Sequence, residues 1–359
     1  MNHPHESALQ YPLGENLPAA GQCLEIAPGI KWIRMSLPFA LDHINLWLLR
    51  DRQEDMYGQM VDGWSVIDCC VNRTEARIQW EQIFANELEG LPVLRVIVTH
   101  MHPDHIGLAG WLCEHWKAPL WISATDYNTA RVAMKDRDGF GGESGFEFYR
   151  LHGQTDADFL THVRGRGSYY SSLVSPIPET YCRIMDGSSI TIGSHDWQCI
   201  VGYGHAPEHM ALYCQALNIL ISGDMVLPRI SANVSVHASE PEANPLQLFL
   251  SSLRRYLELP QDCYVLPSHG KPFTGLHPRV HQLLDHHQER LDDIMKAAQT
   301  RSLSAADILP ILFKRTLDAH QMTFAMGEAL AHLHYLWFAQ QLQRRRDEHG
   351  VIRFQLPHK

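Results

Sequence analysis

The sequence predicts a layered α/β fold followed by a mainly helical C-terminal part. Strand-like and helix-like patterns alternate through the first 125 residues, which is typical of stacked α/β layers. From about residue 277 onward helical patterns dominate. The 359 residues are enough for one large domain and a smaller one.

Each strand is predicted where a short apolar or alternating run is bounded by turn residues. In chain order these runs occupy residues 29–37, 44–51, 64–70, 91–100, 119–123, 189–193, 197–205, 210–215, 218–224 and 263–270. Helical spacing predicts helices at 74–90, 106–117 and 245–259. Thr74 is the expected N-cap of the first helix, and Gly90 closes it.

Residues 126–182 interrupt the alternation. They carry little strand pattern, and we interpret them as an insertion that is partly helical. The clustered glycines and aromatic residues of the insertion are Gly139, Phe140, Gly141, Gly142, Gly145, Phe146, Phe148, Tyr149, Tyr169 and Tyr170.

Composition and charge argue against several classes of protein. The formal net charge of -10 disfavours a protein that coats nucleic acid by bulk electrostatics. No apolar run reaches about 18 residues, so no membrane span is expected. The polar, Pro-containing first 22 residues lack the pattern of a secretory signal. Eight scattered cysteines without a CxxC pair predict reduced thiols and a cytoplasmic protein.

The densest group of chemically active side chains lies at residues 100–105, directly after a buried strand. His100 and His102 are two apart, so on an extended segment they point the same way. The turn at Pro103 can direct Asp104 and His105 toward a second position. Imidazole and carboxylate are ligands of Zn(II), Fe and Mn. The pattern predicts a metal site rather than a polar loop of structural histidines.

One loop cannot complete two metal sites, so further ligands are expected at other strand ends. His205, Asp224 and His269 each follow an apolar strand, where α/β sheets present functional groups. Any one of these residues alone would be interpreted as a structural turn residue. Downstream of residues 100–105, the three together indicate ligands.

These motifs, in this order, resemble those of the metallo-β-lactamase superfamily over roughly residues 25–275. The resemblance implies an αββα sandwich with a dinuclear metal centre. It implies the following ligands: His100, His102 and His205 for one metal, Asp104, His105 and His269 for the other, and Asp224 as a bridge.

The resemblance also implies roles behind the metals. Asp68 matches the first family motif as a hydrogen-bond acceptor, but the usual Asp-Thr-Gly is Asp68-Cys69-Cys70 here. His209 either supports the site or makes a structural hydrogen bond only, and Glu208 stands where Gly is commoner.

Two divalent ions at such a site, zinc first with Fe or Mn as alternatives, would share a water and lower its pKa from 15.7 to about 7. The bridging hydroxide would then be a nucleophile at neutral pH. Asp104 is the expected catalytic residue, because its carboxylate could accept a proton from the attacking hydroxide.

The C-terminal part resembles the winged-helix extension of the β-lactamase-like protein 2 branch, some members of which cut single-stranded RNA. An HHxxR start at His286 and a Gly-Glu-x-x-x-His-Leu helix at 327–333 carry this resemblance, as do residues 223–236. The expected organisation is a tail at 1–22, a catalytic domain at 23–276 with a cap inserted at about 126–182, and a winged-helix-like domain at 277–359.

The favoured function is hydrolysis of a small ester or thioester, as in the glyoxalase II branch, with the small-molecule substrate under an aromatic cap. A single-strand endoribonuclease or phosphodiesterase is the first alternative, suggested by Arg164, Arg166, Tyr169 and Tyr170. The basic run 344–346 gives it less support, because Asp347 and Glu348 follow at once. A lactonase and a non-catalytic ligand-binding protein are further alternatives. The C-terminal part could also form a lid or a homodimer interface.

Overall fold

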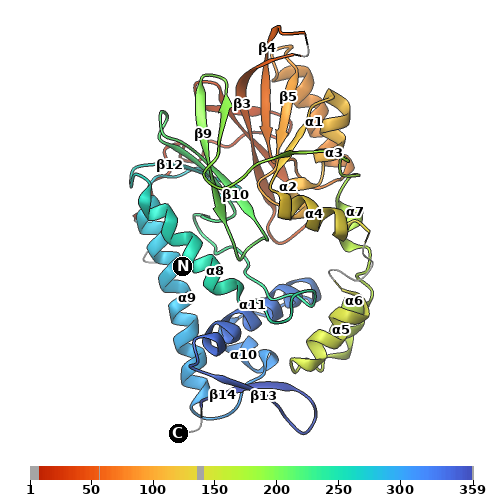
Figure 1. The fold of residues 1–359 in the computed structure, drawn as a ribbon, viewed down its shortest axis with the longest axis vertical. Helices are drawn as coiled ribbons and strands as arrows, with labels where there is room; N and C mark the ends of the chain where they lie inside the picture. Colours follow the sequence, from red (N-terminus) through yellow and green to blue (C-terminus); the bar gives the residue numbers. More distant parts are fainter. Residues whose placement is uncertain (1–7, 56, 136–140, 358–359) are drawn as a thin grey trace.

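Two β-sheets pack face to face, and helices cover both outer faces of the pair (Figure 1). The computed structural model describes residues 8–55, 57–135 and 141–357. The expected αββα sandwich with a mainly helical C-terminal part is confirmed. Gly139 and Phe140 of the insertion, and residues 1–7 of the tail, lie outside the described residues.

The first sheet contains seven strands in sequential order. Strands β1 to β4 form an antiparallel meander, and β5, β6 and β7 extend it in parallel. Their bounds are β1 Cys23–Ala27, β2 Ile30–Ser36, β3 His43–Glu54, β4 Met60–Ile67, β5 Val93–Ile97, β6 Leu120–Ile122 and β7 Cys182–Arg183.

The second sheet contains five strands in the order β12-β11-β10-β9-β8. All its pairings are antiparallel except that of β11 with β12, which is parallel. Their bounds are β8 Ser189–Ile192, β9 His195–Gly202, β10 His209–Cys214, β11 Ile219–Gly223 and β12 Tyr264–Pro267.

Large apolar side chains fill the space between the sheets. Trp32 and Trp47 of the first sheet and Trp197 of the second are each at most 1% exposed, and they belong to one buried cluster. Burying a side chain of this size contributes roughly 1.5–3 kcal/mol. This interior holds the two sheets together and fixes how their strand ends meet.

Helices α1 to α4 lie on the outer side of the first sheet, where Trp80, Leu112 and Tyr127 join its apolar face. Their bounds are α1 Thr74–Asn86, α2 Pro103–Ile106, α3 Ala109–Trp116 and α4 Ala124–Ala133. Helix α1 starts one residue earlier than expected, since Arg73 is its N-cap and Thr74 is its first helical residue. The carbonyl of Arg73 already accepts the first helical hydrogen bond, from the N–H of Arg77.

The insertion contains three further helices, α5 Gly142–Leu151, α6 Ala157–Arg164 and α7 Tyr169–Leu173. Phe159 and Val163 of α6 pack with Met322 from the C-terminal part. Tyr170 of α7 is buried against the first sheet's helical layer. The insertion therefore contacts both the sandwich and the C-terminal helices.

The remaining helices form a layer that begins on the outer face of the second sheet and extends away from the sandwich (Figure 1). Their bounds are α8 Pro245–Arg255, α9 Leu276–Ala298, α10 Ala305–Leu312 and α11 Ala319–Phe338, and a short 3₁₀ turn, η2 Tyr256–Glu258, follows α8. One buried apolar cluster runs from Leu220 of the sheet through Phe249 and Leu283 to Phe354. The chain closes with the antiparallel hairpin of β13 Gln343–Arg346 and β14 Ile352–Gln355. That this part is a winged helix stays a prediction.

Two simpler expectations can be compared with the structure. None of the described helices is long and apolar enough to cross a membrane. All eight cysteines, including the adjacent Cys69 and Cys70, are free thiols.

Candidate metal centre

Four strand ends meet at one edge of the sandwich and bring the candidate ligands together. The loop from β5 into α2 carries residues 100–105, and the other three loops follow β9, β11 and β12. All seven candidates from the sequence take part in three metal-capable groups: His100 with His102 and His205, His100 with His105 and Asp224, and Asp104 with His105 and His269.

The first group is a triangle of imidazole nitrogens. His100 Nε2 lies 2.9 Å from His102 Nδ1 and 3.3 Å from His205 Nε2, and the third side is 3.1 Å. Tetrahedral zinc with Zn–N bonds of 2.0–2.1 Å places its ligands about 3.3 Å apart. The triangle therefore has the dimensions of three ligands around one ion.

The second group surrounds the carboxylate of Asp104. Its Oδ2 lies 3.4 Å from His269 Nε2 and 3.6 Å from His105 Nε2. These separations again suit ligands of a common ion rather than direct hydrogen bonds. Asp104 and His105 follow Pro103, the first residue of α2, and the His105 ring centroid also lies 3.9 Å from that of His100.

Asp224 stands between the two groups. Its Oδ2 lies 3.2 Å from His205 Nε2, while its Oδ1 lies 3.5 Å from His105 Nε2 and 3.4 Å from His269 Nε2. Each oxygen therefore faces a different set of donors.

Several inward-facing atoms of the centre have no hydrogen-bond partner. His105 Nε2, His269 Nε2 and Asp224 Oδ1 are buried and unpaired. Leaving such atoms unpaired costs about 1–3 kcal/mol each, so native proteins rarely do so. A shared cation would satisfy all three, and the residues present therefore fit metal ions.

The backs of the histidine rings are fixed by hydrogen bonds that leave the inward nitrogens free. The Nδ1 atoms donate as follows: His105 to Asp68 Oδ2 at 2.7 Å, His205 to the Asn233 carbonyl at 2.7 Å, and His269 to the His43 carbonyl at 2.7 Å. Such partners set the tautomer and raise the basicity of a metal-binding imidazole. Asp68 thus lies behind the centre, as expected.

Electrostatics differ between the two groups. Burial lowers the pKa values of His100 and His102 well below the ordinary range, so both rings are neutral and ready to bind a cation. In the second group burial acts against charge, but the facing Asp224 and Asp104 outweigh it and raise the pKa of His269 to about 10. Burial likewise acts against ionising Asp104, but His105 and His269 outweigh it and lower the Asp104 pKa to about 2. In the second group, a positively charged His269 therefore faces the negatively charged Asp104.

The turn after Asp68 keeps an unusual backbone without glycine. Asp68 and Cys70 have φ angles of 61° and 69°, in the left-handed region that non-glycine residues rarely adopt. The Cys69 N–H donates to the His105 carbonyl, and the Cys70 carbonyl accepts from Leu108. Strain of this kind persists only where surrounding contacts fix it, and it is common beside functional sites.

His209 holds the backbone of the bridging aspartate. Its Nε2 accepts a hydrogen bond from the Asp224 N–H at 3.1 Å, and burial lowers its pKa to about 3. A Cβ on Gly223 would lie only 2.1 Å from that Nε2, so glycine is required there. The hydrogen bond between His209 and the Asp224 N–H is therefore both a structural contact and a support for the candidate ligand Asp224.

Asp126 is a supporting residue that the sequence reasoning missed. It is fully buried, and its Oδ1 accepts from the Met101 N–H at 2.8 Å and its Oδ2 from the Glu208 N–H at 2.6 Å. It therefore joins the two loops that supply the first group. The signal was the Ser123-x-x-Asp126 start of α4, which forms a capping contact.

A second missed support comes from the C-terminal helix α11. The Asn233 carbonyl holds His205, and the adjoining Val236 N–H donates to the Gly327 carbonyl at 3.1 Å. A Cβ on Gly327 would lie 2.5 Å from Ser235 Oγ, so this loop and α11 approach as closely as glycine allows. No motif in the loop marks a backbone carbonyl as a support.

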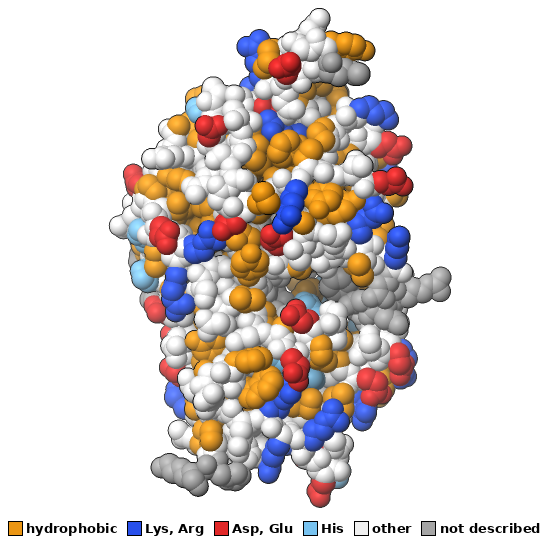
Figure 2. Space-filling model, in the orientation of Figure 1, with side chains coloured by type: hydrophobic (Ala, Val, Ile, Leu, Met, Phe, Trp, Pro, Cys, Tyr) orange, Lys and Arg blue, Asp and Glu red, His pale blue; other side chains and the backbone are white. Residues whose placement is uncertain are grey.

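Figure 2 shows a hollow in the middle of the molecule, with histidine side chains at its floor. Helix α7 packs beside α2 in this region. The charge of Asp104 adds to burial in raising the pKa of Tyr169 of α7.

Comparison with known proteins decides the family. The family model described as the metallo-beta-lactamase superfamily matches residues 60–269, which is more than half of the chain. The chain belongs to the metallo-beta-lactamase superfamily. A second model, the metallo-beta-lactamase-like C-terminal domain, matches residues 291–357.

Individual relatives within the superfamily cover nearly the whole chain. A beta-lactamase domain protein from Burkholderia ambifaria is 49% identical, covers 99% of this chain and 100% of its own, and superposes with a TM-score of 0.91. The metallo-beta-lactamase family protein TTHA1429 from Thermus thermophilus is 26% identical, covers 93% and 100%, and has a TM-score of 0.75. "Probable metallo-hydrolase YqjP" from Bacillus subtilis (strain 168) is 24% identical over 85% of this chain and 91% of its own length.

Proposed function

We propose that the chain is a metal-dependent hydrolase that uses two divalent ions, zinc in the first instance, to cleave a small ester or thioester. The observation that carries this proposal is Asp224, whose two oxygens face two separate donor groups 3.2–3.5 Å away. One carboxylate shared by two cation positions is the arrangement of a two-metal hydrolase. The metallo-hydrolase name of the Bacillus subtilis relative supports the same class.

When bound, the two ions supply an activated water at neutral pH and polarise the carbonyl oxygen of the substrate. The chain's own residues hold that chemistry in place. The side chain of Asp104 is 18% exposed and that of Asp224 is 10% exposed, so Asp104 is the more accessible carboxylate of the centre. It would accept the proton released on attack and pass it on toward the leaving group.

Aromatic side chains from three segments support a small, partly apolar substrate. His320 of α11 stacks on Phe39 with ring centroids 5.6 Å apart, and it contacts Tyr169 and Phe324 at 5.7 Å and 5.0 Å. Phe324 is 42% exposed. Pockets for small ligands are lined mainly by apolar and aromatic side chains, so this aromatic group would contact the acyl part of the substrate.

Two of the basic residues that suggested a nuclease, Arg164 and Arg166, are engaged within the protein. Arg164 pairs with Glu143 at 2.7 Å. Arg166 donates to Thr323 Oγ1 at 2.9 Å and stacks on Tyr169. A phosphodiester strand needs cations that are free to contact phosphates. This pairing favours the ester or thioester over the phosphodiester alternative.

The test combines metal analysis with a substrate panel of thioesters, lactones and phosphodiesters. Purified protein should contain two divalent ions per chain and should turn over the thioesters best. Asp104→Asn should lower kcat at least about 100-fold. Asp62→Asn, which changes an exposed carboxylate on β4, is the matched control and should leave kcat unchanged.

Three results would contradict the proposal. Full turnover after exhaustive chelation would remove the metal ions from the reaction. Turnover of phosphodiesters alone would instead support the ribonuclease alternative, and binding of the panel without any turnover would support a ligand-binding protein.

A further inference from the structure

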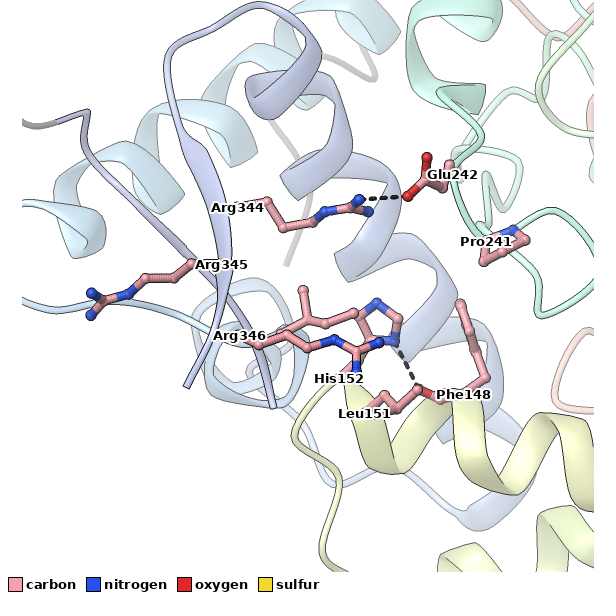
Figure 3. Close-up of a pocket in the computed structure, with 9 residues that line it drawn as sticks. Phe148, Leu151, His152, Pro241, Glu242, Arg344, Arg345 and Arg346 are labelled. Atoms are coloured by element: carbon pink, nitrogen blue, oxygen red, sulfur yellow. Dashed lines mark hydrogen bonds and ion pairs between the residues drawn. The ribbon is translucent and has the colours of Figure 1, made fainter. Parts of the chain in front are cut away.

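A cavity of about 450 Å³ lies away from the metal centre, between the insertion and the C-terminal hairpin (Figure 3). Three separate segments form its wall, namely α5, the loop before α8, and β13 with β14. The lining residues are Phe148, Leu151, His152, Pro241, Glu242, Arg344, Arg345, Arg346 and Ile352. Its volume falls within the usual range for small-ligand sites, roughly 300–1,000 Å³.

The arginine run of β13 has a defined geometry. Alternate residues of a strand share a face, and in Figure 3 Arg344 and Arg346 extend over the cavity while Arg345 points away. Arg344 is held by an ion pair with Glu242 and by stacking on Trp337, with its guanidinium 3.9 Å from the ring centre. The direction of the Arg344 side chain is thus fixed by these two contacts.

The charge of Arg346 is not neutralised by the acidic residues that follow it in sequence. Asp347 instead pairs with Arg353 at 2.6 Å and closes the hairpin turn through the N–H of Val351. The side chain of Arg346 has no hydrogen bond or ion pair with any residue in 8–55, 57–135 or 141–357. Because Glu242 offsets Arg344, the cavity retains the positive charge of Arg346.

The rest of the wall is apolar or neutral. Phe148 and Leu151 of α5, with Ile352 of β14, provide an apolar surface. His152 donates Nδ1–H to the Phe148 carbonyl at 2.7 Å, which leaves its Nε2 as an acceptor. Burial, with the nearby arginines, lowers the pKa of His152 to about 4, so the ring adds no charge at neutral pH.

We propose that this cavity binds a small organic anion, with a carboxylate or phosphate at Arg346 and Arg344 and an apolar group against Phe148 and Leu151. A guanidinium pairs with either anion through parallel N–H···O bonds. The site is separate from the metal centre, so the proposal does not depend on the proposed function.

Isothermal titration of the full-length, metal-loaded protein tests the proposal, with benzoate, phenyl phosphate and inorganic phosphate as probes. Benzoate and phenyl phosphate distinguish a carboxylate from a phosphate. Comparing phenyl phosphate with inorganic phosphate measures how much the phenyl ring adds to the affinity. We expect at least one aromatic anion to bind about tenfold more tightly than inorganic phosphate. Arg346→Ala should weaken that binding about tenfold or more.

Arg345→Ala is the matched control, because it removes the same charge from the neighbouring position of the same strand. It should change the affinity less than about twofold. Equal weakening by both variants would show diffuse attraction rather than a site. Binding that Arg346→Ala leaves intact would place the probe elsewhere, the metal centre included. Either result would overturn the proposal, as would tighter binding of a single-stranded RNA oligomer that depends equally on Arg345 and Arg346.

Discussion

A methyl group added at Gly327 should weaken metal binding although residue 327 contacts no candidate ligand. The new Cβ would lie 2.5 Å from Ser235 Oγ and 2.6 Å from Ser235 Cβ. Carbon atoms in ordinary contact are about 3.5–4.0 Å apart, so the loop at 231–236 must move by about 1 Å. That loop carries the Asn233 carbonyl that fixes His205.

We expect Gly327→Ala to raise the zinc dissociation constant about 10–100-fold and to lower kcat by a similar factor. Losing a support behind a metal ligand has effects of this size, and a displacement of about 1 Å can cost a factor of about 100 in rate. Competition with a chelating dye measures the affinity. Alanine is the better helix former by about 1 kcal/mol, which partly offsets the roughly 1–3 kcal/mol that overpacking costs.

A double variant separates displacement of the loop from general damage. In Gly327→Ala/Ser235→Gly the two closest atoms are gone, and the nearest remaining atom is the Cα of residue 235 at 3.4 Å. Zinc affinity should return to within about threefold of the wild-type value. The reasoning is refuted if folded Gly327→Ala binds zinc as tightly as the wild type, or if the double variant is no better than the single one.

Three further predictions follow from the same geometry. Asp224→Ala removes the carboxylate between the two donor groups, and elemental analysis should find at most one ion per chain, whereas two retained ions would exclude bridging. Because burial raises the pKa of Asp126 to about 6 from an ordinary 3.8, its contribution to folding is complete below pH 4 and is lost as the pH rises through 6. Urea unfolding of the metal-free protein should therefore show the wild type losing about 1–3 kcal/mol relative to Asp126→Asn between pH 4 and 7, and a constant difference would contradict this assignment. Tyr170→Phe deletes a buried hydroxyl that donates to the Met101 carbonyl at 2.6 Å, and denaturant titration should show a loss of about 1 kcal/mol, with no change counting against that bond.

The candidate ligands could be predicted from sequence because each follows a strand with a clear apolar pattern and has an imidazole or carboxylate side chain. Their supports could not. The Asn233 carbonyl acts through the backbone, which every residue possesses, and Asp126 acts across two loops that only the folded chain brings together. The left-handed turn at Cys70 likewise follows from tertiary contacts that override its local preference.

The layers themselves were predictable to within a few residues, because apolar runs define strands whatever their partners. The packing of α6 against α11 was not predictable, since Phe159 and Met322 are far apart in sequence. From their position in the sequence alone, Asp347 and Glu348 were expected to offset the charge of the arginine run 344–346. The structure shows that Asp347 turns to Arg353 instead, because the hairpin places residue 353 opposite the run.

The position of the candidate ligands on two different sheets has a consequence for the stability of the protein. His100 and His102 extend from the first sheet, whereas His205, Asp224 and His269 extend from the second, so any ion held between them ties the two halves of the sandwich together. Without metal, buried donor atoms between the two sheets would lack hydrogen-bond partners. The metal-free protein should therefore be less stable and more readily degraded by proteases than the metal-bound protein.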